Sequence, residues 1–417
     1  MNLKINDHNS FESLKILFNK NSIFVGLDQF ITSLFNFILL IYLSNNFDLI
    51  EVGKYSLIFS FQMILQMLFF CIIYEPLNIE KYSKNRKEIF QILLFLLMII
   101  TLFIFFIIYY FKNFLDLNLN YYILLYFNLI FIKEFIKKIN IQKLISYLNF
   151  LISLITYTLL TIYLFYFTDD KLNNIFDIYF YLFLFEIFFF IFFFKKIILL
   201  IKDLNLISFK KVFIDLKKRS SSLLLFYFAK DVGNYFLVFL ITIFVGFQLA
   251  AIFRIFQSIL GVINTFILAM ENIYPHRLSQ IYQNSKLDFR NTFIINLSFI
   301  VILFLFVVLI INYFLEDILK VLYSVNNVNY EVLFLVMSLV LLTGIFNNFV
   351  RFYLRITDNL NKLDKSNLIQ LFIILFIAPL LLIEFKMMGL ILTISITTIN
   401  YLFLSTNIFL NNILKLK

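Results

Sequence analysis

The sequence predicts an all-α, multi-pass membrane protein with about twelve transmembrane helices in two six-helix lobes. Hydrophobic residues make up 62% of the 417 residues and charged residues only 14%, a balance that excludes a water-soluble globule. Apolar stretches of about 20 residues, the length that crosses a bilayer as a helix, recur along the whole chain. They show no strand-like alternation and are about twice as long as a barrel strand, which excludes an outer-membrane barrel.

Each predicted span is one such stretch, bounded by polar or charged residues. Cys71, inside the second stretch, is the single cysteine, so disulfides within the chain play no part. In chain order we expect helices over residues 22–44, 53–74, 88–111, 119–136, 144–167, 175–194, 220–244, 249–272, 291–315, 329–350, 366–383 and 389–411.

The basic residues predict the orientation of these spans, because cytoplasmic loops collect Lys and Arg. With the N-terminus inside, the cytoplasmic segments hold 28 of the 35 basic residues, the segment 133–143 included, and the outward loops hold five. Both termini are therefore expected in the cytoplasm. The basic residues of the cytoplasmic segments account for the net charge of +10, so a nucleic-acid partner is not needed to explain it. Two basic residues remain within spans, Lys230 and Arg254.

A basic segment divides the chain into two parts of six spans each. We expect an N-terminal lobe over residues 1–200, a cytoplasmic linker over 201–219 that faces anionic lipid, and a C-terminal lobe over 220–417.

The two parts resemble each other. "FDLIEVGKYSLIFSF" begins at Phe47 and "FQLAAIFRIFQSILG" begins at Phe247, and Pro76 and Pro275 fall 199 residues apart near the ends of the corresponding spans. Since each part has an even number of spans, the repeat is parallel, with a pseudo-two-fold axis along the membrane normal. Transporters built from such repeats bind substrate between the repeats and move one lobe against the other.

Four segments resemble the bacterial O-antigen and capsule flippases, which belong to the superfamily of multidrug and toxin extrusion transporters. They are residues 28–61 ("DQFITSLFNFILLIYLSNNFDLIEVGKYSLIFSF"), "EPL" at 75–77, "KEFIKK" at 133–138 and "FRIFQSILGVINTFILAMENIYPHR" at 253–277. The resemblance implies flipping of an undecaprenyl-diphosphate-linked oligosaccharide to the outer leaflet of the bacterial inner membrane, for surface polysaccharide assembly. It also implies membrane lipid, a polysaccharide polymerase and a chain-length regulator as partners. In this sequence, Lys and Ile replace much of that family's usual Arg, Ala and Gly.

Arg254 and Lys230 are the predicted substrate-binding residues. Arg254 lies about 10 Å into the eighth span at 1.5 Å per residue, and Lys230 lies close to the middle of the seventh. A charge against lipid costs a few kcal/mol, whereas a cation that lines a hydrated cavity can bind a diphosphate. The alternative for Arg254 is a side chain that extends to the outer headgroups.

Three carboxylates in or near the spans are candidates for ion coupling or for lining the cavity: Asp28, Asp231 and Glu186. Asp28 can coordinate a cation or balance Lys230, and Glu186 is neutral, paired across helices or ion-coupled. Gating or structural roles are expected for residues at two cytoplasmic span ends, namely Glu75, Pro76, Glu271 and Pro275.

Enzyme chemistry finds no support in the sequence. No His cluster, paired carboxylates or Gly-rich phosphate loop is present, and the seven glycines are too few to build one. We therefore expect no metal, no cofactor and no intrinsic ATP hydrolysis.

A multidrug or cation antiporter of the same fold is the first alternative function, and the core carboxylates keep it open. An integral-membrane polysaccharide polymerase is the second, which the short and nearly uncharged outward loops disfavour.

Overall fold

The computed structural model describes residues 20–74, 86–114, 121–143, 145–167, 175–201, 233–261, 281–283, 285–325, 330–357 and 364–414. Every regular element in these ranges is a helix, so the predicted all-α class is confirmed. The N-terminal half contains α2 (Lys20–Asn46), α3 (Leu49–Phe69), η1 (Phe70–Tyr74), α6 (Arg86–Phe114), α7 (Tyr122–Gln142), α8 (Ser146–Phe167), η2 (Ile175–Asp177) and α9 (Ile178–Ile201).

The C-terminal half is also helical throughout its described residues. Each of the twelve predicted spans coincides wholly or partly with a helix of one half or the other. The elements of this half are α11 (Gly233–Phe244), the Phe247–Gly261 helix, α13 (Lys286–Tyr313), α14 (Leu315–Tyr323), α15 (Glu331–Ile356), α16 (Asp364–Phe372), η5 (Ile373–Ile377), α17 (Ala378–Ile408) and η6 (Phe409–Ile413).

Seven of the described helical segments are long and apolar enough to cross a membrane, and α11 and the Phe247–Gly261 helix are shorter apolar segments. One of the seven, Asn367–Ile413, counts 47 residues, which as a straight helix measures about 70 Å, more than twice the hydrocarbon thickness. The backbone at Lys386 leaves the helical region (φ 48°, ψ −118°), and Gly389 lies against the Leu381 carbonyl. The chain therefore folds back there, as the separate spans 366–383 and 389–411 predict.

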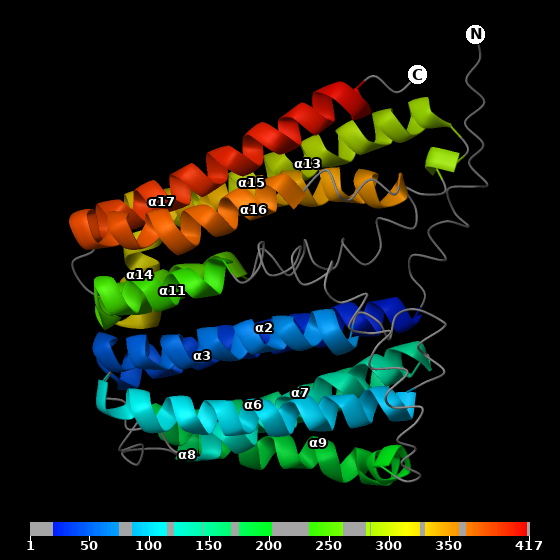
Figure 1. The fold of residues 1–417 in the computed structure, drawn as a ribbon, viewed down its shortest axis with the longest axis vertical. Coiled ribbons are helices and arrows are strands. Elements are labelled where there is room, and N and C mark those ends of the chain that lie inside the picture. The colour runs from blue at the N-terminus through cyan, green and yellow to red at the C-terminus, as the bar shows by residue number, and fades with distance from the viewer. Residues whose placement is uncertain are drawn as a thin grey trace.

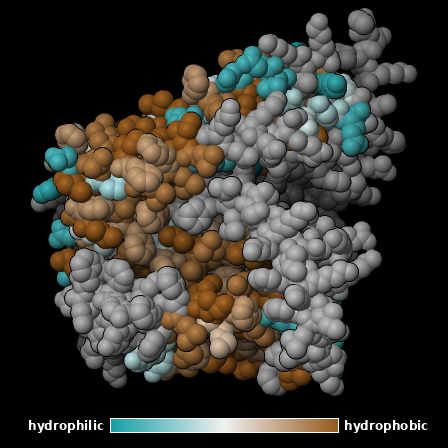
Figure 2. Space-filling view, in the orientation of Figure 1, coloured by the Kyte–Doolittle hydropathy of each residue, from teal (hydrophilic) through white to brown (hydrophobic). Residues whose placement is uncertain are grey.

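The helices lie side by side in two bundles, one from each half of the chain (Figure 1). α2 begins and α17 finishes at the same end of the molecule, as an even number of spans requires (Figure 1). Hydrophobic side chains cover most of the described middle of the face in Figure 2, and hydrophilic ones gather mainly towards the ends of the helices. This distribution fits a chain whose solvent is the bilayer.

The two halves contact each other at one end of the bundle, where α3 packs against α11 and α2 against α14. A Cβ atom added at Gly53 of α3 would lie 2.1 Å from the carbonyl oxygen of Phe247, so only glycine permits this approach. The Asn45 side chain donates a hydrogen bond to the Leu322 carbonyl (3.1 Å) and accepts one from Ser324. If the predicted orientation is correct, this closed end faces outwards.

α14 is absent from the predicted spans, and it supplies part of this contact. Leu315, Leu319 and Tyr323 recur every four residues and form its buried face. Glu316 and Asp317 lie in its first turn and Lys320 in its last, which complements the helix dipole. A nine-residue helix is too short to span a bilayer, so a search for long apolar runs passes over it.

The fourth predicted span, 119–136, ends too early. α7 continues to Gln142, and Lys133 and Lys137 are only 2% and 4% exposed. Both lysines are therefore buried on a helix, which hydropathy does not predict, because it registers the cost of a buried amine but not the carboxylate that compensates it on another helix.

Candidate functional site

Arg254 lies at the boundary between the two halves. Its helix starts at Phe247, directly after Gly246 (φ 128°), which places Arg254 about 10 Å along the helix. The guanidinium carbon is 3.9 Å from the centre of the Phe59 ring on α3 of the other half, a cation–π contact. Nη1 donates a long hydrogen bond to Gln257 Oε1 (3.3 Å). The side chain thus lies against the N-terminal half and not along the lipid face.

The described surroundings of Arg254 are aromatic. Tyr55 and Tyr179 of the N-terminal half and Tyr235 and Tyr323 of the C-terminal half are close enough to interact electrostatically with the guanidinium. Within the described ranges no carboxylate lies within 4 Å of it, and Arg254 Nε and the Tyr179 hydroxyl have no hydrogen-bond partner. The site therefore holds one positive charge and two unused donors.

A second cluster of charges lies inside the N-terminal half. Lys133 of α7 pairs with Glu186 of α9 at 2.6 Å, with side chains 2% and 3% exposed. The ammonium also donates to the Tyr157 hydroxyl (3.0 Å) and lies 4.7 Å from the Tyr157 ring and 5.6 Å from the Phe189 ring. Carboxylate, hydroxyl and two aromatic faces together compensate the buried ammonium.

Lys137, one turn further along α7, pairs with Asp28 of α2. Its ammonium donates to both carboxylate oxygens, at 3.0 and 2.9 Å, and is 4.0 Å from Glu134 Oε1. Asn149 of α8 donates to the Lys137 carbonyl (3.1 Å). α7 is thus held by charge to α2 on one side and to α9 on the other.

These pairs determine which charges remain for a ligand. Asp28 and Glu186, the two predicted core carboxylates that the structure describes, each face a lysine of α7. Their partners were missed in the sequence, although the spacing of Lys133 and Lys137 is visible there: residues four apart lie on one helix face. Lys54, which the predicted repeat pairs with Arg254, bonds Glu51 of its own helix (2.7 Å), so of these two residues the C-terminal one reaches across the boundary.

Six predicted site residues lie outside the described residues, and their roles stay predictions. Among the residues that the structure does describe, no group of three or more His, Cys, Asp or Glu side chains could hold a metal ion. The six are Lys230, Asp231, Glu75, Pro76, Glu271 and Pro275.

No protein-family model and no curated protein matches the sequence, but two solved structures resemble the fold over nearly its whole length. One is an inward-facing conformation of a multidrug resistance MATE family transporter of the MOP superfamily, with 14% identity, a TM-score of 0.65, and coverage of 91% of this chain and 93% of that one. The other is a MOP superfamily transporter from Pyrococcus furiosus, with 13% identity, a TM-score of 0.61, and coverage of 95% and 96%. Reversed polarity of its binding pocket is said to suggest a different function.

The protein is a multi-pass membrane protein with the fold of MOP superfamily transporters. Membership of the O-antigen and capsule flippases stays a prediction, because identities of 13–14% show the fold alone.

Proposed function

We propose that this protein is a transporter that flips an undecaprenyl-diphosphate-linked oligosaccharide across the bacterial inner membrane, for assembly of an O-antigen or capsule. The observation that carries the proposal is Arg254, a cation at the boundary between the halves that has no carboxylate partner among the described residues. An arginine fork binds a phosphate oxygen pair with two parallel hydrogen bonds. Its unused Nε–H and the Tyr179 hydroxyl are the kind of donors that such an anion requires.

The distribution of charge favours an anionic substrate over a cationic one. A transporter of organic cations needs a carboxylate free to face its substrate, but Asp28 and Glu186 are each engaged by a lysine at 3.0 Å or less. Removing such a carboxylate from its lysine would leave a buried ammonium uncompensated, which costs several kcal/mol. Releasing Arg254 to bind a substrate costs less free energy, because its described partners are one aromatic ring and one weak hydrogen bond.

The packing between the halves fits alternating access. The contact between Gly53 and Phe247 and the bonds of Asn45 join the halves near one end of the described helices. Breaking this contact while the opposite end closes would change the side of the membrane to which Arg254 is exposed. This motion requires no ATP, and an ion gradient can drive it.

A multidrug antiporter is the second candidate, because the solved structure with the higher TM-score of the two is a multidrug resistance transporter. The reversed pocket polarity described for the transporter from Pyrococcus furiosus is a precedent for a change of substrate charge on this fold. A cationic substrate would have to displace the lysines of α7 or use residues outside those described.

The test is flipping of a fluorescent undecaprenyl-diphosphate oligosaccharide in proteoliposomes. We expect the wild type to flip it, Arg254→Ala to lose at least nine tenths of the rate, and Arg254→Lys to keep part of it, because the charge survives and the fork does not. Lys143→Ala, at an exposed position at the end of α7, is the matched control and should flip normally.

Two outcomes would overturn the proposal. One is full flipping by Arg254→Ala. The other is a wild type that moves a fluorescent organic cation and leaves the glycolipid in place, which would establish the antiporter instead. In cells whose surface polysaccharide depends on this protein, Arg254→Ala should abolish export while the protein remains in the membrane.

A further inference from the structure

α2 presents an apolar face to the lipid and a packed face to the N-terminal half. The lipid face carries four residues that are 39–40% exposed and recur at intervals of four and three residues: Ile23, Leu27, Phe30 and Leu34. The packed face includes Asp28 and Phe35, which are seven residues apart and so lie on one side of the helix. Asp28 pairs with Lys137, and the Phe35 ring stacks on Tyr157 of α8 with 4.5 Å between the ring centroids.

A third face of α2 is polar. Gln29, Ser33 and Asn36 recur at the same intervals of four and three residues, and they lie about a third of a turn from each of the other two faces. Phe37, four residues after Ser33 and on the same side of the helix, contacts Tyr323 of α14 with 6.3 Å between the ring centroids. This side of α2 is therefore turned towards the C-terminal half. We call Gln29, Ser33 and Asn36 the polar face of α2.

The polar face of α2 is left unpaired by the described residues. Its three side chains are half-buried, and none of them has a hydrogen-bond partner in the described part of the chain. An amide that is left unpaired against hydrocarbon costs several kcal/mol. The polar face therefore borders water or a polar ligand.

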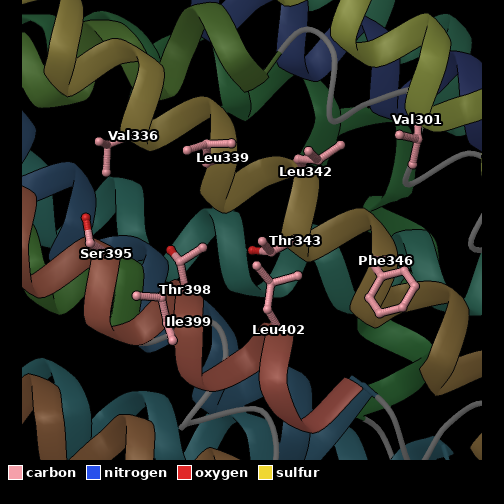
Figure 3. A pocket seen from close by; sticks show the side chains of 10 residues that line it. All are labelled: Val301, Val336, Leu339, Leu342, Thr343, Phe346, Ser395, Thr398, Ile399 and Leu402. Carbon is pink, nitrogen blue, oxygen red and sulfur yellow. The ribbon is translucent and has the colours of Figure 1, made fainter. Parts of the chain in front are cut away.

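Hydroxyls in the C-terminal half show the contrasting arrangement. Figure 3 shows three of them in the wall of an otherwise apolar pocket between α13, α15 and α17, and each donates to a carbonyl three or four residues earlier on its own helix: Thr343, Ser395 and Thr398. Such hydroxyls have already used their one hydrogen, so they require no water. Ser33 makes no such bond within the described residues, which leaves its hydroxyl available to a ligand.

α3 contributes a further amide on the side that faces the C-terminal half. Gln66 comes seven residues after Phe59 and so shares the face that meets Arg254. It is half-buried and has no hydrogen-bond partner among the described residues. Measured from the closed end of the bundle, Arg254 lies about 10 Å deep, Asn36 about 15 Å, and Gln29 and Gln66 about 25 Å. These amides thus continue from the depth of Arg254 towards the opposite end.

We propose that the polar face of α2 and Gln66 bind the sugar hydroxyls of the substrate while Arg254 holds its diphosphate. This inference rests on the proposed function and divides its site into two parts. A side-chain amide offers two donors and an acceptor, which suits a sugar hydroxyl that both donates and accepts. A phosphate only accepts, so the donors of Arg254 suit it better. Gln29, Ser33, Asn36 and Gln66 include no carboxylate that would attract an organic cation.

Thiol labelling tests whether the polar face borders water. In a Cys71→Ser background, Ser33→Cys and Leu34→Cys place single cysteines on neighbouring residues, and Leu34 is 39% exposed on the lipid face. We expect a charged methanethiosulfonate to modify Ser33→Cys at least about tenfold faster than Leu34→Cys in proteoliposomes, because the reactive thiolate forms beside water and not in apolar surroundings. Equal rates would overturn the proposal.

Binding to purified protein separates the two parts of the site. The probes are the undecaprenyl-diphosphate oligosaccharide, extracted from cells that make the surface polysaccharide, and undecaprenyl diphosphate without sugar. Asn36→Leu should weaken binding of the oligosaccharide about 2- to 10-fold, the loss of one neutral hydrogen bond, and leave the sugar-free affinity unchanged. Arg254→Ala should weaken binding of both probes. The matched control is Thr32→Val, whose lost hydroxyl donates to the Asp28 carbonyl (2.8 Å), so both probes should bind it normally.

The outcomes distinguish this inference from the proposed function. Equal losses for the two probes in Asn36→Leu, or no loss for either even when Gln66→Leu is added, would overturn the sugar site and leave the diphosphate site standing. If Arg254→Ala binds both probes like the wild type, or if the wild type binds neither, the proposed function fails as well. A lower Tm for Asn36→Leu would show that Asn36 has a partner inside the protein, and would also overturn the proposal.

Discussion

Replacing Lys133 by Met should destabilise the protein by about 3–5 kcal/mol, the usual cost of leaving one member of a buried ion pair without its partner. The two atoms of the pair are 2.6 Å apart, and Coulomb attraction at that distance amounts to about 6 kcal/mol at an effective dielectric constant of about 20. Part of this offsets the desolvation of both charges. The variant keeps the desolvated Glu186 and loses the attraction.

The reciprocal variant should lose less. Glu186→Leu leaves the Lys133 ammonium with the Tyr157 hydroxyl at 3.0 Å and with two aromatic faces, so we expect the lower end of the same range. Lys133→Met combined with Glu186→Leu should recover most of the loss, because two apolar side chains of similar volume replace a buried pair at little or no cost.

Cys71 provides the assay. It is the single cysteine of the sequence and is 1% exposed in the structure, so a maleimide that fluoresces on reaction with thiols reports its exposure as the protein unfolds on heating. At 2–4 °C per kcal/mol, a value typical of domains of 150–250 residues, Lys133→Met should lower Tm by roughly 10 °C. Lys143→Met makes the same substitution at an exposed position of α7 and should change stability by less than about 0.5 kcal/mol.

The result that refutes this reasoning is additivity. If the double variant is destabilised by the sum of the two single effects, the side chains do not interact and α7 is held in another way. A Lys133→Met variant as stable as Lys143→Met would show that Lys133 lies in water and not in a buried ion pair.

Two further predictions concern the boundary between the halves. Gly53→Ala should lower the free energy of unfolding by about 1–3 kcal/mol through overpacking against Phe247. The control Gly344→Ala, in a helix with no described atom within 4 Å of the added Cβ, should be neutral or slightly stabilising. Equal Tm values for the two variants would contradict the close approach. Phe59→Leu should lose the cation–π contact with Arg254, and a double-mutant cycle with Arg254→Gln should give a coupling of about 0.5–2 kcal/mol. Zero coupling would mean that the guanidinium does not lie over that ring.

The sequence predicts the spans well because hydrophobic length is a property of each segment alone. Even the fold-back at Lys386, where one helical run would otherwise count 47 residues, follows from the polar residues that interrupt it. α14 was not predicted, because its sequence shows apolar residues every four positions over nine residues and not a long apolar run.

The site was less predictable, because its partners come from segments far apart in the chain. Arg254 was found, since a charge in an apolar run is visible without a structure, but the ring that receives it lies 195 positions earlier, at Phe59. Asp28 and Lys137 are separated by 109 positions, and no local pattern links them. A basic residue in the last part of a predicted span is equally typical of a cytoplasmic loop, so only the packing of α7 distinguishes the two.

The charges of α7 also set an order for biogenesis. Inserting a lysine near the centre of a helix costs about 2.5–3.5 kcal/mol, so α7 enters the bilayer poorly on its own. Lys137 meets a carboxylate made 109 residues earlier, but the partner of Lys133 is synthesised 53 residues later. When α7 leaves the ribosome, the carboxylate that pairs with Lys137 has been synthesised and the one that pairs with Lys133 has not. We therefore expect α7 to remain beside the translocon until α9 emerges.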